Sequence, residues 1–250
     1  MIEKIKNIIN SARLNYASKK RKKLLSEQID KKKVAHLVNT VNCDYEWYGS
    51  SYGGFYVNPK LLSSDSIIYS FGIGKDISFD LTCIKKHNCK IFAFDPTPLS
   101  INYIKNKKLS DLFTFFDWGI SDLKSGLVDF YLPANPKGIS GSLIKINGVN
   151  PKNSIKVKMK LFDEITGELG HQHIDVLKMD IEGSEYTVLE KILDSTVTID
   201  QILVEFHDRL FDLNNYKSKE IIKKLNEKGY EIFAGSISYE EISLIHKNKL

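Results

Sequence analysis

The segment VLKMDIEGSE, residues 176–185, constrains the fold of this chain most strongly. Its apolar start predicts a buried strand, and Gly183 predicts a turn into a helix. Three carboxylates stand where the strand ends: Asp180, Glu182 and Glu185. Buried carboxylates need a cation or hydrogen-bond donors, and this edge of an open α/β sheet is where ligands bind. A helix N-terminus also explains the two glutamates, but Asp180 belongs to the strand end.

A second strand-to-helix turn contains two glycines, Gly72 and Gly74, which let the backbone turn tightly and approach a ligand closely. The next apolar run ends in Asp95. An acidic residue about 20 positions after a glycine-rich turn can accept both hydroxyls of a ribose. Ile77 stands where the dinucleotide fingerprint has its third glycine. A nucleoside ligand without a pyrophosphate, such as S-adenosylmethionine, therefore fits better than NAD.

Apolar runs and helical patterns alternate along most of the chain, which predicts an α/β fold with a mostly parallel sheet and helices on both faces. The last two strands follow each other after a short turn, which predicts an antiparallel edge strand. The predicted strands are 67–71, 90–94, 112–116, 174–179, 200–206, 230–234 and 242–246, and the predicted helices are 76–87, one from Pro98, 184–193 and 217–228.

The length of 250 residues suits one main domain at 61–250, preceded by a helical and aromatic cap segment at 1–60. Within the cap, residues 43–58 are predicted to form an ordered loop. Alternating runs around 125–162 predict an inserted β-hairpin. The net charge of +5 is mild, and the lysine-rich stretch 19–33 is better explained by a solvated helix face than by nucleic-acid or membrane binding.

Composition narrows the functional classes further. No apolar run is long enough for a membrane span, and the N-terminus lacks the pattern of a secretory signal. Three cysteines, Cys43, Cys83 and Cys89, show no metal-binding spacing, and such sparse usage is typical of a reducing compartment. We therefore expect a cytoplasmic protein with no nucleic-acid partner. The sequence leaves the oligomeric state open, and a homodimer is one possibility.

Five segments together resemble the FkbM family of S-adenosylmethionine-dependent methyltransferases: SFGIGKDISFD, FAFDPTP, FFDWGISD, VLKMDIEGSEYTVL and ILVEFH. The resemblance covers roughly residues 67–210. It implies the Rossmann-like class I methyltransferase sheet, with seven strands and the last one antiparallel. It also implies O-methylation, commonly of carbohydrate hydroxyls in nucleotide sugars, capsule, lipopolysaccharide or other glycans and natural products.

The resemblance assigns roles to residues at the predicted strand ends. Gly72 and Gly74 would approach the methionine and ribose parts of the cofactor, and Asp95 would bind the ribose. Asp117 and Trp118 would border the adenine. The methionine end and the acceptor would face Asp180 and Glu182, and Glu205 and His207 would close the site.

His207 is a candidate general base, because O-methylation needs the acceptor hydroxyl deprotonated as it attacks. If His207 only positions the acceptor, Asp180 or Glu182 would take that role. A divalent ion, Mg²⁺ or Mn²⁺, is a further possibility, with Asp180, Glu205 and His207 as an oxygen and nitrogen ligand set.

The acceptor is expected to be a small molecule or a glycan. Tyr52, Phe55 and Tyr56 could stack on a sugar ring or pack the cap on the sheet, and residues 140–142 could contact its hydroxyls. Three alternatives stay open: N-methylation of a small amine or amide, a non-catalytic cofactor-binding module, and an NAD-dependent epimerase or dehydrogenase. His171 and His173 flank a turn and are expected to be surface loop residues.

Overall fold

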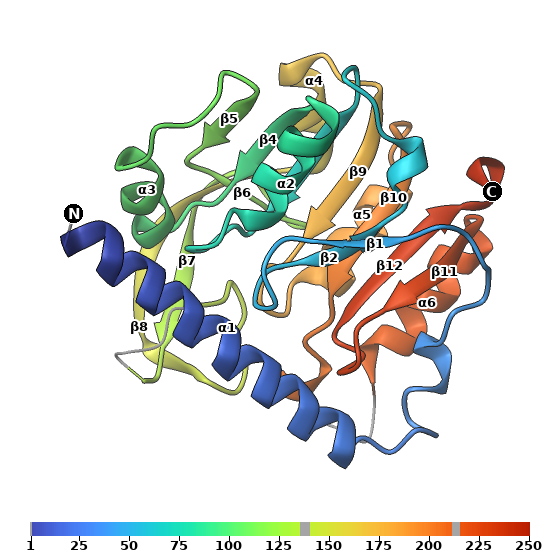
Figure 1. The fold of residues 1–250 in the computed structure, drawn as a ribbon, viewed down its shortest axis with the longest axis horizontal. Helices are drawn as coiled ribbons and strands as arrows, with labels where there is room; N and C mark the ends of the chain where they lie inside the picture. Colours follow the sequence, from blue (N-terminus) through green and yellow to red (C-terminus); the bar gives the residue numbers. More distant parts are fainter. Residues whose placement is uncertain (1, 136–140, 212–215) are drawn as a thin grey trace.

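A computed structural model describes residues 2–135, 141–211 and 216–250 of the chain (Figure 1). Its centre is a seven-stranded sheet with the strand order β5-β4-β3-β9-β10-β12-β11. This order, with parallel neighbours from β5 to β10, confirms the predicted Rossmann-like methyltransferase sheet. The strands are β3 (Ile67–Phe71), β4 (Lys90–Phe94), β5 (Phe113–Phe116), β9 (His173–Met179), β10 (Thr198–Glu205), β11 (Tyr230–Gly235) and β12 (Glu241–His246).

The last two strands, β11 and β12, pair antiparallel at the edge of the sheet, as the sequence pattern predicts, and β12, which runs against the other strands, lies one position inside that edge. β12 pairs antiparallel with both β10 and β11, so β11 forms the edge. The register places Ile242 beside Val204 and Leu244 beside Ile232. The tight turn after β11 sends β12 back into the space between β10 and β11. A turn pattern shows that two strands are adjacent, but it does not show which of them also pairs with a third.

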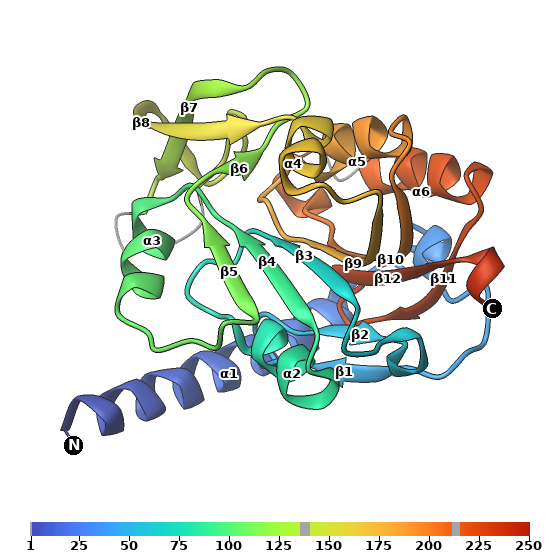
Figure 2. The same ribbon diagram turned by 90° about the horizontal axis from the view of Figure 1, so that it is seen from above.

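Both faces of the sheet are covered (Figure 2). Helices α4 (Phe162–Leu169), α5 (Glu185–Leu193) and α6 (Lys217–Glu227) pack on one face, and α2 (Ser78–His87), α3 (Pro98–Lys105) and a small strand pair pack on the other. Successive side chains of a strand point to opposite faces. Ile202 accordingly belongs to one hydrophobic cluster and Leu203 to the other. This two-sided burial explains why the central strands are apolar throughout.

The N-terminal segment packs on the domain through a long helix and a strand pair. Helix α1 (Ile2–Gln28) crosses the molecule (Figure 1), and Arg21 on it forms an ion pair with Glu240 at 2.8 Å. The predicted aromatic loop 43–58 contains the antiparallel strands β1 (Glu46–Tyr48) and β2 (Phe55–Val57). Short 3-10 turns occupy 35–37, 59–61, 208–210 and 247–249. Among the residues that the structure describes, no helix combines the length and apolarity needed to cross a membrane.

A second, three-stranded sheet is inserted after β5 (Figure 2). β7 (Gly126–Pro133) and β8 (Val149–Lys160) pair antiparallel where the sequence predicts a hairpin, and β6 (Gly119–Ile120) adds to β8 in parallel. The insertion brings Gly119, Phe130 and Met159 to the pocket described next.

Candidate active site

One pocket lies at the carboxyl ends of β3, β4 and β9 and contains about 870 Å³ of empty space, part of which is open solvent at its mouth. Parallel sheets present their ligand-binding edge at this end. The inserted sheet and the loop before β2 complete its walls. Of the predicted cofactor and catalytic residues, Gly72, Gly74, Asp95, Asp180 and Glu182 line it, whereas Glu205 and His207, which were expected to close the site, do not.

The two glycines of the first turn serve different purposes. Gly72 has φ +74°, and a Cβ atom there would lie 1.7 Å from the carbonyl oxygen of Asp180. Only glycine therefore lets the turn after β3 lie against the end of β9. Gly74 has φ +51°, but a Cβ atom there would meet no atom within 4 Å. The backbone at Gly74 therefore borders open space, which leaves room for a ligand directly against it.

Asp95, at the end of β4, is buried and organises this turn. Its Oδ2 accepts the N–H of Gly74 at 2.9 Å. Its Oδ1 accepts the N–H of Thr97 at 2.9 Å and the Thr97 hydroxyl at 2.6 Å. A carboxylate has about four lone-pair positions. Three of them are used within the protein, so about one remains for a ligand in the pocket.

The structure does not place Asp117 or Trp118 on the pocket wall. The side chain of Asp117 is 58% exposed and lies 3.8 Å from the Lys158 ammonium. Trp118 is buried in the hydrophobic core. The following residues, Gly119 and Ile120, line the pocket instead. The sequence pattern locates the correct strand end, but the direction of each side chain depends on the inserted sheet.

Glu185 shapes the turn at the opposite side of the pocket. This fully buried carboxylate accepts the N–H of Ile181 at 2.9 Å and the N–H of Gly183 at 2.9 Å. It also accepts a hydrogen bond from Nδ1 of His207 at 2.9 Å. Sequence reasoning explains Glu185 by the helix N-terminus alone and does not pair it with His207. The pair fixes the orientation of the imidazole.

The other imidazole nitrogen of His207 faces three carboxylates. Nε2 lies 3.3 Å from Glu182, 3.6 Å from Glu205 and 3.7 Å from Asp180. Burial alone would lower the pKa of His207, but the charges of Glu185, Glu205 and Glu182 hold it well above its ordinary value. A lone pair on Nε2 would be repelled by the carboxylates. The site therefore favours a proton, or another cation, at Nε2.

The carboxylates themselves are affected by burial. Burial raises the pKa of Asp180 to about 6, although the Lys178 ammonium opposes that shift. Burial and the charge of Asp180 raise the pKa of Glu205 well above its ordinary value. Lys178 is buried inside β9 and donates to the carbonyl oxygen of Gly72 at 2.8 Å. The single lysine in this otherwise apolar strand is the sequence feature that could have indicated a buried cation beside the pocket.

Glu182 adopts a backbone conformation that is uncommon for a side chain larger than glycine, with φ +53°. The Ser142 hydroxyl from the inserted segment donates to its carbonyl oxygen at 2.8 Å. Such conformations cluster at functional sites. Gly141 also lines the pocket, whereas Ser140 lies outside the described residues.

Tyr52, from the loop between β1 and β2, lines the same pocket as Asp180 and Glu182. Burial, together with the charges of Asp180 and Glu182, raises the pKa of its phenol. Phe55 is instead buried in the core, and Tyr56 packs edge-on against Trp47. Of the three aromatic candidates for a sugar platform, the structure brings only Tyr52 to the pocket.

Of the predicted metal ligands, Asp180 and Glu205 both lie near Nε2 of His207. The compact group of potential ligand atoms, however, contains Glu185 in place of Glu205. Atoms of Asp180, Glu185 and His207 all lie within 4.8 Å of one another. Glu185 already accepts two backbone N–H groups. His207 would therefore offer Nε2, and Asp180 or Glu205 the oxygen.

Curated relatives match most of this chain at low identity. The human "Probable methyltransferase-like protein 24" is 25% identical over 186 residues, covering 70% of this chain and 43% of its own length. The rat protein of the same name is 23% identical over 186 residues, covering 70% and 44%. This chain thus spans less than half the length of these relatives.

A solved structure shows a weaker likeness. Fibrillarin of Aeropyrum pernix, in complex with natively bound S-adenosyl-L-methionine, is 12% identical with a TM-score of 0.39, and the match covers 74% of this chain and 66% of that one. The fold assignment rests on the strand order of this chain. The sequence pattern described as the methyltransferase FkbM domain matches residues 54–232, well over half of the chain. The chain belongs to the FkbM methyltransferase family.

Proposed function

We propose that this chain is an S-adenosylmethionine-dependent O-methyltransferase that acts on a carbohydrate hydroxyl. One observation carries the proposal: the glycine turn with Asp95 and the carboxylates Asp180 and Glu182 line the same pocket. A nucleoside end and an acceptor end can therefore be held in one continuous site. Most of the rate enhancement would come from holding the reacting groups in line.

Gly72, Gly74 and Asp95 would hold the methionine and ribose parts of the cofactor. The open space at Gly74 and the remaining acceptor position on Asp95 fit such a ligand. The adenine would lie near the end of β5, where Gly119 and Ile120 take the place that the sequence suggests for Asp117 and Trp118. When bound, S-adenosylmethionine supplies an electrophilic methyl group on a positively charged sulfur.

The acceptor side combines an aromatic ring with carboxylates. Tyr52 offers a flat apolar face, and Asp180 and Glu182 accept hydrogen bonds from hydroxyl groups. This combination suits a sugar ring, which has both C–H faces and hydroxyl edges. A small cationic amine would also be attracted by the carboxylates, so N-methylation is the second candidate.

Asp180 is better placed than His207 to take the acceptor proton, because Asp180 lines the pocket, whereas the His207 side chain is buried and does not line it. A histidine whose pKa is held well above its ordinary value already carries its proton near neutral pH. Asp180, with a pKa of about 6, is ionised there and still basic enough to accept a proton. His207 would then hold the carboxylates in place, and Glu182 would orient the acceptor hydroxyl.

A divalent ion at Asp180, Glu205 and His207 is the alternative to a proton at Nε2. A methyl-transfer screen decides between these possibilities. Purified protein is incubated with radiolabelled S-adenosylmethionine and a panel of nucleotide-linked sugars, free sugars and small amines, in EDTA or in added Mg²⁺ or Mn²⁺. Labelled sugar in EDTA is the expected result. Labelled amine, or activity only with metal, would support the rival assignments.

Absence of any product despite cofactor binding would instead favour a non-catalytic binding module. The cytoplasmic location belongs to the same proposal and is supported by the sparse cysteine content.

A further inference from the structure

A second group of potential metal ligands lies at the amino ends of β9 and β10, which is the opposite end of these strands from the pocket. His173 is the first residue of β9, and Asp175 follows two positions later on the same strand. Asp200 on β10 lies between Ile199, which pairs with Ile174, and Gln201, which pairs with Val176. Asp200 and Asp175 are therefore side-by-side neighbours. Like charges at such positions repel, so a cation between or beside them would stabilise the pair.

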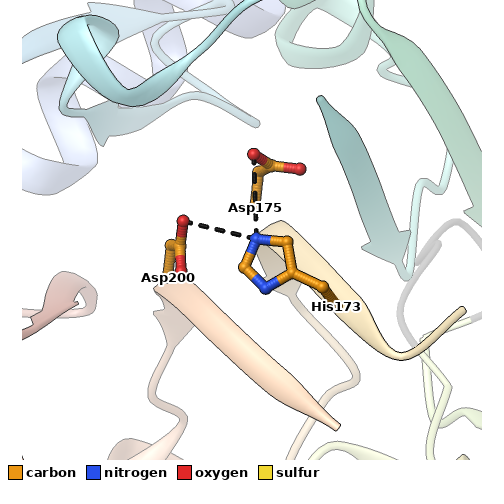
Figure 3. A group of neighbouring side chains, drawn as sticks. All are labelled: His173, Asp175 and Asp200. Atoms are coloured by element: carbon orange, nitrogen blue, oxygen red, sulfur yellow. Dashed lines mark ion pairs between the residues drawn. The ribbon is translucent and has the colours of Figure 1, made fainter. Parts of the chain in front are cut away.

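The three side chains converge on one imidazole nitrogen (Figure 3). Nε2 of His173 lies 3.4 Å from Oδ2 of Asp200 and 3.9 Å from Oδ1 of Asp175. All three ligand atoms lie within 4.8 Å of one another. Ions that bind nitrogen and oxygen at roughly 2.0–2.2 Å hold neighbouring ligand atoms about 3–3.5 Å apart. A small movement of the side chains would complete this coordination.

Groups outside the cluster hold two of these ligands in a binding orientation. Nδ1 of His173 lies 2.8 Å from the Thr198 hydroxyl, which leaves Nε2 to face the carboxylates. Asp175 accepts the N–H of Ile67 at 2.7 Å and the Ser66 hydroxyl at 3.1 Å. Partners of this kind fix the tautomer and direction of metal ligands.

A cation already approaches the cluster. The Lys249 ammonium lies 3.1 Å from Oδ2 of Asp200, and its side chain is 41% exposed. Asp200 is buried, but the Lys249 side chain reaches it from the surface and is partly exposed, so the lysine can turn into solvent when a metal ion takes its place beside the carboxylate. The cluster also adjoins a surface pocket lined by His173, Asp200 and Lys249, which gives an ion access from solvent.

We propose that His173, Asp175 and Asp200 bind a divalent transition-metal ion, with Zn²⁺ or Mn²⁺ as the fitting class, and that the ion displaces Lys249. Imidazole with two carboxylates favours these ions over Ca²⁺ and Mg²⁺, which take oxygen ligands. The ion would join the starts of β9 and β10 and would act on stability, away from the methyl-transfer pocket. This site is independent of the proposed function.

The test is isothermal titration of the full chain, freed of metal with EDTA, with ZnCl₂ and MnCl₂. We expect binding of Zn²⁺ or Mn²⁺ that His173→Ala weakens at least tenfold. His173 is 41% exposed on its side chain, so this variant should fold. Asp180→Asn changes only the carboxylate group at the pocket, at the carboxyl end of β9, and should leave this metal binding unchanged.

Lys249→Ala gives the sharpest outcome, because it removes a competing cation without removing a ligand. We expect it to tighten binding about two- to fivefold, because the ion no longer competes with the ammonium for Asp200. No binding of either metal to the wild-type chain, or binding that His173→Ala leaves intact, would overturn the proposal. Binding that Lys249→Ala leaves unchanged or weakens would overturn the displacement of Lys249.

Discussion

Glu185 and His207 form a fully buried pair that joins the start of α5 to the end of β10, with Oε1 2.9 Å from Nδ1. The same carboxylate holds the backbone N–H groups of Ile181 and Gly183. One side chain thus sets both the turn that carries Asp180 and Glu182 and the imidazole that faces them. The shape of the acceptor side depends on this pair.

Replacing Glu185 should therefore destabilise the protein strongly. Glu185→Gln removes the charge partner of a buried imidazolium, and breaking a buried ion pair costs about 3–5 kcal/mol. Urea denaturation measures the loss. Glu190→Gln on the same helix is the matched control, because Glu190 pairs with Lys224 at the surface and should change the free energy of unfolding by less than about 1 kcal/mol. Equal effects of the two variants would contradict the role of the buried pair.

The pH dependence of methyl transfer distinguishes the two candidate bases. If Asp180 takes the proton, the rate with the acceptor found in the screen should fall as pH drops through about 6 and stay level above it, because only the ionised carboxylate accepts a proton. Asp180→Asn should lower turnover roughly 10²- to 10⁴-fold. A rate that instead rises well above pH 7 and is lost in His207→Asn would assign the base to His207, whose pKa is raised.

Cofactor binding should depend on Asp95 and not on Asp117. Asp95→Asn keeps an oxygen for Thr97 but loses the charge for a ribose hydroxyl, so the affinity for S-adenosylmethionine should fall at least tenfold in calorimetry. Asp117→Asn changes an exposed carboxylate outside the pocket and should leave the affinity unchanged. A loss of affinity in Asp117→Asn would show that Asp117 turns toward the adenine when the cofactor binds.

Gly72 and Gly74 should respond differently to a side chain. Gly72→Ala puts a Cβ atom 1.7 Å from the Asp180 carbonyl oxygen, so it should destabilise the folded protein in thermal melts. Gly74→Val meets open space and should retain the circular dichroism spectrum, with a small cost from its positive φ, while losing cofactor binding. Normal binding by Gly74→Val would make the second glycine a structural turn only.

Much of the sheet could be predicted because its signals are local. The strands at 67–71 and 90–94 match the predicted boundaries, since each apolar run stops at a turn residue or a polar side chain. The start of α3 is also a local signal: Thr97 before Pro98 is a typical helix start, and the Thr97 side chain caps that helix. The short strands β1, β2 and β6 were not predicted, because three or two residues form a strand only when a partner is present.

The sequence by itself determined which residues end the parallel strands, and therefore that Gly72, Gly74, Asp95 and Asp180 would share one edge of the sheet. Only the tertiary structure decided the contacts between segments far apart in the chain. It placed β12 between β10 and β11, paired Glu185 with His207, and brought Asp200 beside His173. Strand identity follows from local periodicity, whereas charge pairing and pKa depend on distances that folding sets across many residues.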